Sequence, residues 1–331
     1  MKFKEKNKII GVGSALVDIL IHESNSFIEK TGQKKGSMTL VDIDYIEKLL
    51  SEVKSSPSYV PGGSACNTSM GISKLGGISS FVGKRGEDKL GNYIEEYLKT
   101  NNVTPILFRS KSPTGKVLSV ITPDAQRTMF TFLGASSETS PDELTKTCFE
   151  NAAIVHIEGY LVFNQDLIIS ALKSAKEAGA FISLDLASFN VVESSRDFLK
   201  TIIHDYVDIL IANEDEAGVY TGVSDDDAAL KKLSEDVEIA ILKVGKKGSY
   251  ISNSNQVIKI EPQLGQDVVD TTGAGDLWAS GFLFGLVNGY PLEICGNIGS
   301  ICGYEVCRTI GASIPDDRWI KIKDAVSQMV K

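Results

Sequence analysis

The sequence predicts an α/β protein in which helices cover both faces of a mainly parallel β-sheet. From about residue 150 onward, short and almost continuously apolar segments alternate with longer segments that are apolar on one face. Before that point, shorter segments alternate between apolar and polar residues, and after Gly275 the chain reads as helical to its end. A strand buried on both faces is apolar throughout, whereas a half-exposed strand alternates, so the chain predicts two different sheets.

The first third predicts a strand that begins at Ile9, followed by a small sheet. We expect this sheet to be inserted in two pieces, about residues 15–42 and 105–135, as antiparallel strands with one face in water. The clearest strands are 116–122 and 127–133, and the intervening helices are about 64–75 and 88–101.

The remainder predicts the large sheet and its covering helices. Near-continuous apolar strands connected by amphipathic helices indicate parallel pairing. The predicted strands are 153–157, 181–185, 207–211 and 239–243, and the predicted helices are 165–178, 195–204, 276–288, 292–308 and 317–330. Gly289 and Pro291 separate two of the last three helices.

Composition limits the function classes. The chain has 331 residues and a formal net charge of −9, which argues against nucleic-acid and anionic-membrane partners because both need a basic surface. The five cysteines form no CxxC pair, which disfavours a structural zinc site and fits a reducing cytoplasm. No stretch approaches the roughly 18 apolar residues of a membrane span. We expect a soluble, cytoplasmic protein.

The sharpest local motif is the glycine-containing segment 270–283, which leads directly into an apolar helix. Amides of Gly273, Ala274 and Gly275 would converge on an anion at the start of that helix. From the residues alone, Asp276 is either a helix-capping aspartate or a general base that takes a proton from an attacking hydroxyl. The segment is neither a GxxxxGK[ST] phosphate loop nor a dinucleotide fingerprint.

This segment resembles the C-terminal signature of the PfkB (ribokinase-like) carbohydrate kinases. Four further segments resemble the family's other motifs and follow in its order. They are the segment around Asp18 and the segments 61–67, 213–216 and 242–248. The resemblance implies a single kinase domain over residues 1–331, with a ribokinase-like three-layer αβα sandwich, a mainly parallel central sheet and a β-sheet lid from about 15–42 and 105–135.

The resemblance also implies ATP-dependent phosphorylation of a small molecule, with Asp276 as base and Gly273, Ala274 and Gly275 around the γ-phosphate. The residues implied for substrate are Asp18, Ser14, Gly62, Gly63, Ser64, Asn67 and Arg127. Those implied for nucleotide are Asn213, Glu216, Lys243, Gly245, Gly248 and Thr272. Mg²⁺ is expected near Glu216 through water, and K⁺ at Asp270 with residues 308–313. Without the resemblance, Asp18 reads as a turn aspartate and Glu216 as part of an acidic first helical turn.

The substrate stays open between two classes. Segments 36–42, 122–135 and 158–161 resemble the adenosine-kinase-like branch, and a purine slot is expected from four aromatic residues. These are Phe130, Phe132, Tyr160 and Phe189. Ser14 and Asp185 stand where that branch often has asparagine, so adenosine or another nucleoside competes with a free sugar (ribose, fructose or a 2-keto-3-deoxy sugar acid). A non-catalytic sugar- or nucleotide-binding protein is the alternative from another class. In either case we expect a monomer or a homodimer.

Overall fold

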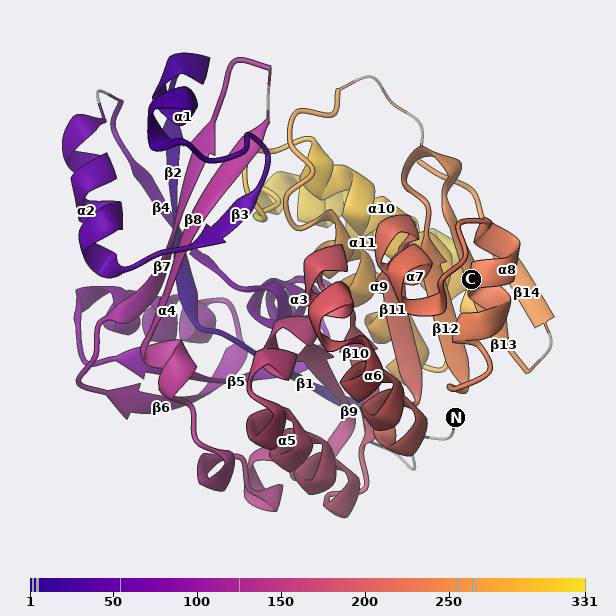
Figure 1. Cartoon of the computed structure of the whole chain (residues 1–331). Helices are drawn as coiled ribbons and strands as arrows, with labels where there is room; N and C mark the ends of the chain where they lie inside the picture. The colour runs from indigo at the N-terminus through magenta and orange to yellow at the C-terminus, as the bar shows by residue number, and fades with distance from the viewer. Residues whose placement is uncertain are drawn as a thin grey trace.

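The computed structural model contains two β-sheets (Figure 1). Residues from both sheets line one cavity. It describes residues 1, 3, 6–53, 55–124, 126–254, 256–263, 265 and 267–330. Within these residues, a nine-stranded sheet has the order β14-β13-β12-β11-β10-β9-β1-β5-β6, and a five-stranded sheet has the order β3-β8-β7-β2-β4. The predicted α/β fold class is confirmed.

The large sheet is parallel from β6 to β12 and ends in an antiparallel hairpin. Its parallel strands are β1 (Lys8–Val12), β5 (Ile78–Gly86), β6 (Val103–Ser110), β9 (Ala152–Glu158), β10 (Phe181–Asp185), β11 (Ile209–Asn213) and β12 (Ile239–Lys243). The hairpin consists of β13 (Ser249–Asn253) and β14 (Gln256–Ile260). Because all seven parallel strands run the same way, their carboxyl ends share one edge of the sheet.

Helices cover both faces of this sheet. One face packs against α5 (Gln165–Glu177), α6 (Phe189–Tyr206), α7 (Glu214–Thr221) and α8 (Asp226–Leu233). The other packs against α3 (Ser64–Lys74), α4 (Lys89–Thr100), α9 (Ala274–Val287) and α10 (Leu292–Cys307), with α11 (Asp316–Met329) outside them. Neighbouring residues divide between the layers: Ile9 packs with Phe282, and Ile10 packs with Ile168. Among the described helices, none is both long and apolar enough to cross a membrane.

The small sheet has one covered face and one face that lines the cavity. Its strands are β2 (Leu16–His22), β3 (Met38–Leu40), β4 (Ser58–Gly62), β7 (Thr114–Ile121) and β8 (Arg127–Gly134). Helices α1 (Asn25–Thr31) and α2 (Ile43–Glu52) cover the outer face, as Figure 1 shows, around a core that includes Ile19, Ile46 and Phe130. The sequence predicts that one face of the small sheet lies in water. In the structure, that face lines the cavity instead.

The pieces of chain that form the small sheet differ from those predicted. Residues 105–110 belong to β6 in the large sheet, and 58–62 supply β4 of the small one. An edge strand is exposed on one side, so β6 alternates like a small-sheet strand, and its Pro105 is tolerated there because an edge needs fewer amide donors. Pairing is also mixed: β7 and β8 are antiparallel, whereas β2 and β7 are parallel.

Most of the predicted helices and parallel strands are present with small shifts. The largest concerns α6, which begins at Phe189 rather than 195, because the Ser188 hydroxyl caps it by accepting from the Val191 amide. Its backbone leaves helical geometry at Ser195, where φ is −129°, and the sequence pattern becomes clear only beyond this point.

Candidate active site

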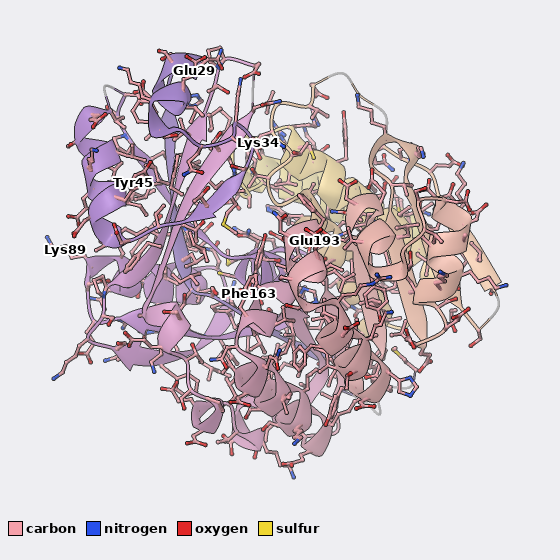
Figure 2. The ribbon with its side chains drawn as sticks, in the orientation of Figure 1. Glu29, Lys34, Tyr45, Lys89, Phe163 and Glu193 are labelled. Atoms are coloured by element: carbon pink, nitrogen blue, oxygen red, sulfur yellow. The ribbon has the colours of Figure 1, made fainter. Side chains whose placement is uncertain are left out.

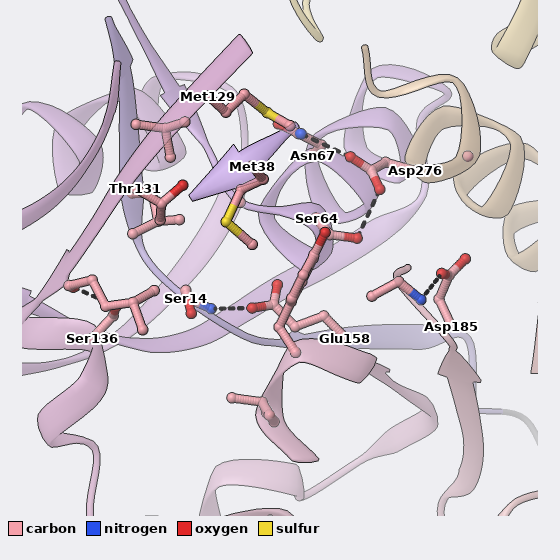
Figure 3. A pocket seen from close by; sticks show the side chains of 18 of the residues that line it. Ser14, Met38, Ser64, Asn67, Met129, Thr131, Ser136, Glu158, Asp185 and Asp276 are labelled. Carbon is pink, nitrogen blue, oxygen red and sulfur yellow. Dashed lines mark hydrogen bonds between the residues drawn. The ribbon is translucent and has the colours of Figure 1, made fainter. Parts of the chain in front are cut away.

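A cavity of about 810 Å³ lies where the carboxyl edge of the large sheet faces the small sheet. Five of the seven parallel strands carry a polar lining residue at or just beyond their carboxyl end, and Figure 3 labels three of these residues, Ser14, Glu158 and Asp185. The five residues are Ser14 after β1, Glu158 on β9, Asp185 on β10, Asn213 on β11 and Lys243 on β12. Strand order therefore assembles polar side chains that are far apart in the sequence, at the edge where open α/β sheets bind ligands.

Asp276 lies in the first turn of α9, and its carboxylate faces the cavity. Its Oδ1 accepts a hydrogen bond from the Ser64 hydroxyl at 2.7 Å, and its Oδ2 accepts one from Asn67 Nδ2 at 2.9 Å (Figure 3). Burial raises the pKa of Asp276, whereas these two hydrogen bonds lower it. The carboxylate is thus held by α3 and turned to the cavity, which is the geometry of the general-base interpretation.

The helix start beside Asp276 depends on Gly273. This residue has a φ of 72°, and a Cβ on it would lie 2.6 Å from the Ala312 Cβ. Gly273, Ala274 and Gly275 all line the cavity, and so does Thr272. The first amides of a helix lack intrahelical partners, so this end of α9 can accept an anion.

The Gly62–Gly63 pair brings the start of α3 against two substrate-side residues. A Cβ on Gly63, whose φ is 104°, would lie 2.2 Å from the Ser14 carbonyl oxygen, and a Cβ on Gly62 would lie 2.8 Å from the Asp18 carboxylate. Only glycine permits both approaches. Gly63 lines the cavity, while Gly62 stands directly behind Asp18.

Glu158 joins two of these segments, and we did not assign it a role from the sequence. Its carboxylate accepts from the Ser14 amide at 2.8 Å and from the Ala65 amide at 3.1 Å. Burial raises its pKa to about 7, and the two backbone amides partly offset that rise. A side chain at Gly13 would collide with it, since a Cβ there would lie 2.2 Å from Oε2. The signal available in the sequence is the acidic residue that ends a mostly apolar strand.

Asp18 and Arg127 face the cavity from the small sheet. Asp18 is 6% exposed, and burial raises its pKa to about 6, with the Arg127 charge opposing the rise and the Asp276 and Asp270 charges adding to it. Arg127 Nη2 donates to the Met129 sulfur at 3.0 Å, and its buried Nη1 has no hydrogen-bond partner among the described residues. An unpaired guanidinium nitrogen at a cavity wall is suited to an anionic ligand.

Asn213 and Glu216 form a reciprocal cap at the start of α7. Asn213 Oδ1 accepts from the Glu216 amide at 2.9 Å, and Glu216 accepts from the Asn213 amide at 2.8 Å and from its Nδ2 at 2.7 Å. Glu216 is 3% exposed, and burial raises its pKa to about 7, with the Asp185 charge adding to the rise and Lys243 opposing it. The two side chains therefore cap α7, whose first turn is acidic, and both residues also line the cavity.

The predicted residues that do not line the cavity are Gly62, Gly245, Gly248 and Asp270. Gly245 and Gly248 bracket the turn after β12 with φ values of 51° and 96°. Asp270 ties two segments together: Oδ1 accepts from the Thr272 amide at 3.0 Å and hydroxyl at 2.8 Å, and Oδ2 accepts from the Gly311 amide at 2.8 Å. Asp270 thus contacts the 308–313 segment through the Gly311 amide, and the K⁺ site expected there stays a prediction.

The apolar wall of the cavity differs from the predicted aromatic slot. Tyr160 lines the cavity, but Phe130 is fully buried under α1 and α2, Phe132 packs toward the same core, and Phe189 is 48% exposed and absent from the lining. Alternate residues of β8 face opposite ways, so 129, 131 and 133 face the cavity and 130 does not. The apolar lining includes instead Leu16, Met38, Leu40, Val117, Met129, Leu133, Leu161, Phe163 and Leu167.

Phe163 is the most exposed member of this wall, at 59%. It ends the 3₁₀ turn Gly159–Phe163, and Figure 2 shows it between the small sheet and α6. Met38 and Met129 approach the cavity from the small sheet, as Figure 3 shows. The small-sheet side of the cavity is therefore mainly apolar apart from Asp18 and Arg127, and the other carboxylates line the cavity from the large-sheet side.

Comparisons with known proteins agree with this geometry. The family model described as pfkB family carbohydrate kinase matches residues 27–319. The structure of adenosine kinase from Sinorhizobium meliloti is 30% identical and superimposes with a TM-score of 0.89 over 98% of this chain and 99% of that one. Probable fructokinase-5 of Arabidopsis thaliana is 28% identical over 77% of this chain and 84% of its own. Adenosine kinase of Dictyostelium discoideum is 26% identical over 93% and 96%.

Proposed function

The chain belongs to the PfkB family of carbohydrate kinases, and within that family we propose that it transfers the γ-phosphoryl group of ATP to a hydroxyl of a nucleoside such as adenosine. Nucleoside and sugar kinases both occur among its relatives, so family membership alone does not choose the acceptor.

The observation that carries the nucleoside proposal is the apolar wall beside Asp18. Leu16, Val117 and Met129 line the cavity from the same small sheet as Asp18. An ionised carboxylate can accept hydrogen bonds from two neighbouring hydroxyls of a ribose, and an apolar wall next to it suits a planar base. A free sugar has hydroxyls around its whole ring, and these would lose hydrogen bonds against that wall.

The reaction follows from the position of Asp276. The acceptor hydroxyl lies between Asp18 and Asp276, and Asp276 takes its proton as the oxygen attacks phosphorus. Amides at Gly273, Ala274 and Gly275 then stabilise the charge that develops on the transferred phosphoryl oxygens. Ser64 and Asn67 keep the base directed at the hydroxyl. Closing the small sheet over the cavity would exclude water and so suppress ATP hydrolysis, which is the lid role we assign to it.

The metal chemistry fits a site that is completed by the nucleotide. Among the described residues, no cluster of three or more His, Cys, Asp or Glu side chains is arranged to hold a metal ion. Mg²⁺ typically keeps several waters and binds one or two carboxylates plus substrate phosphates, so Glu216 is a suitable partner through water. When bound, Mg²⁺ would neutralise phosphate charge. The proposed K⁺ site would include the carboxylate of Asp270. That carboxylate also accepts hydrogen bonds from the backbone amides of residues 272 and 311.

Kinase of a free sugar is the second candidate, and it is favoured by the fructokinase relatives. A binding protein without catalysis is the candidate from another class, and the intact arrangement of Asp276 with its two donors opposes it.

The deciding experiment is a coupled ADP-release screen with Mg²⁺ over nucleosides, pentoses, hexoses and 2-keto-3-deoxy sugar acids, each with and without K⁺. The proposal expects the highest kcat/KM with a purine nucleoside. A free sugar that exceeds every nucleoside replaces the proposed acceptor, and ligand binding without any ADP release supports the binding protein.

A further inference from the structure

A buried ion pair at the carboxyl edge of the large sheet takes no step in the reaction proposed above, although the family resemblance implies a nucleotide contact for its lysine. Lys243 Nζ donates to Asp185 Oδ2 at 3.0 Å, with the two side chains 15% and 9% exposed. The pair spans the ends of β10 and β12 across β11. Burying an ion pair costs desolvation energy that the attraction between the two charges need not offset. Stabilisation of the fold is therefore a weak explanation for the burial of this pair.

Asp185 is fixed through both carboxylate oxygens. Its Oδ2 accepts from Lys243, and its Oδ1 accepts from the Ala187 amide at 2.8 Å, as the dashed line in Figure 3 shows. Ala187 has a φ of 66°, which is uncommon for a residue with a Cβ. A carboxylate anchored by the backbone on one side can orient a cation on the other.

Lys243 is oriented towards the anion-binding end of α9. A Cβ on Gly275, the second residue of that helix, would lie 2.9 Å from the ammonium nitrogen. The ammonium group is therefore beside the amides proposed to receive the transferred phosphoryl group. An ammonium charge there would add to the helix dipole and the amide donors.

The charge balance of the cavity makes this cation important. Among the described lining residues, six are carboxylates and two are cations. The carboxylates are Asp18, Glu158, Asp166, Asp185, Glu216 and Asp276. Of the two cations, Arg127 lies on the small sheet and Lys243 on the large one, beside α9. A polyphosphate entering along the large sheet meets carboxylates at two strand ends and at the starts of helices, and Lys243 offsets their charge.

We propose that Lys243 binds the γ-phosphoryl group during transfer and that Asp185 is the positioning residue that holds its ammonium group at the start of α9. This proposal rests on the proposed kinase function and assigns a site for the transferred group within it. Lys243 releases Asp185 in part as negative charge develops on the phosphoryl oxygens, and no covalent bond to the protein forms.

The test uses Lys243→Gln, Asp185→Asn and the double variant, with Lys176→Gln as the matched control. Lys176 also pairs with an aspartate, Asp208, at 2.7 Å, but it lies on α5 and outside the cavity lining. Asn and Gln at the two positions can form a neutral hydrogen bond, so the double variant leaves no unpaired buried charge.

The first readout is nucleotide affinity, measured by calorimetry with Mg²⁺ and either ADP or the non-hydrolysable analogue AMP-PNP. Lys243→Gln should weaken AMP-PNP about tenfold or more and ADP less than about threefold, because ADP lacks the γ-phosphate. Equal weakening of both nucleotides, or of neither, overturns the proposal. Lys176→Gln should change neither affinity.

The second readout is kcat with the best acceptor. Lys243→Gln should lower kcat about 100-fold, in the range found when one donor to a developing charge is removed. The double variant should recover at least about tenfold of this loss, since it removes the carboxylate left facing the phosphates. A double variant no better than Lys243→Gln contradicts the role of Asp185.

The experiment distinguishes a variant that does not fold from a failure of the proposed kinase function. If Lys243→Gln alone does not fold, the neutral double variant must still show selective loss of AMP-PNP affinity over ADP. If the wild-type protein releases no ADP with any acceptor, the proposed function fails, while the ratio of AMP-PNP to ADP affinity still decides the role of Lys243.

Discussion

Replacement of Asp276 by Asn tests the chemistry most directly. The side chain keeps its size, and one of its terminal atoms remains an oxygen that can accept from Asn67. The Ser64 hydroxyl can reverse and accept from the new amide, so both contacts with α3 survive. The proton acceptor alone is lost. General-base catalysis contributes about 10²–10⁴-fold to rate, which corresponds to roughly 3–5 kcal/mol of transition-state stabilisation.

The expected result for Asp276→Asn is a kcat lower by about 1,000-fold, with unchanged or tighter nucleotide binding because the cavity loses one negative charge. Burial raises the pKa of Asp276, so its ionised form is costly in the folded state and the melting temperature should not fall. Coupled ADP release, AMP-PNP calorimetry and thermal unfolding measure the three quantities. Asp197→Asn, an exposed change on α6, is the control. A variant within about tenfold of wild-type kcat refutes the base assignment.

Three further substitutions and one pH profile test the rest of the site. Asp18→Asn should raise the acceptor KM about 10–100-fold, the loss of one charge-assisted hydrogen bond, and leave AMP-PNP affinity unchanged in calorimetry. Burial raises the pKa of Asp18 to about 6, so kcat/KM should fall as the pH drops through that value. The contribution of Asp18 to the free energy of unfolding should instead grow as the pH falls towards its pKa in the unfolded chain. A flat pH–rate profile contradicts the first expectation. Phe163→Ala should raise KM about tenfold for a purine nucleoside and leave KM for a free pentose unchanged. Equal changes in the two KM values would show that Phe163 does not contact the base. Gly63→Ala should lower the free energy of unfolding in urea by about 3 kcal/mol through backbone strain, whereas Gly289→Ala, with a φ of 74° and no atom near its added Cβ, should cost about 1 kcal/mol.

The glycine motif and the order of segments along the chain were sufficient to predict the fold class and the family. Parallel strands such as β10 and β12 are apolar on both faces, and this local property is visible in the residues themselves. The glycine-containing helix start at Gly273 to Gly275 was also readable, because glycine allows close approach of an anion to the free amides of a helix start.

The contacts that favour the general-base interpretation of Asp276 over helix capping are visible only in the tertiary structure. Ser64 and Asp276 are separated by 212 positions in the sequence, and no local pattern connects them. Likewise, the sequence of β8 alone does not decide which of its two faces lines the cavity. The position of α1 and α2 decides that Phe130 is core and Met129 is cavity lining.

The same distinction applies to the charges. Sequence composition shows an acidic chain, but the environment of each carboxylate depends on which strand ends lie side by side. Glu158 meets two backbone amides, whereas Asp185 meets Lys243 from two strands away. Periodicity and motifs report what each segment does locally. The partners of buried polar groups are set by sheet order and layer packing, because desolvation and hydrogen bonding depend on distances between segments that are remote in the chain.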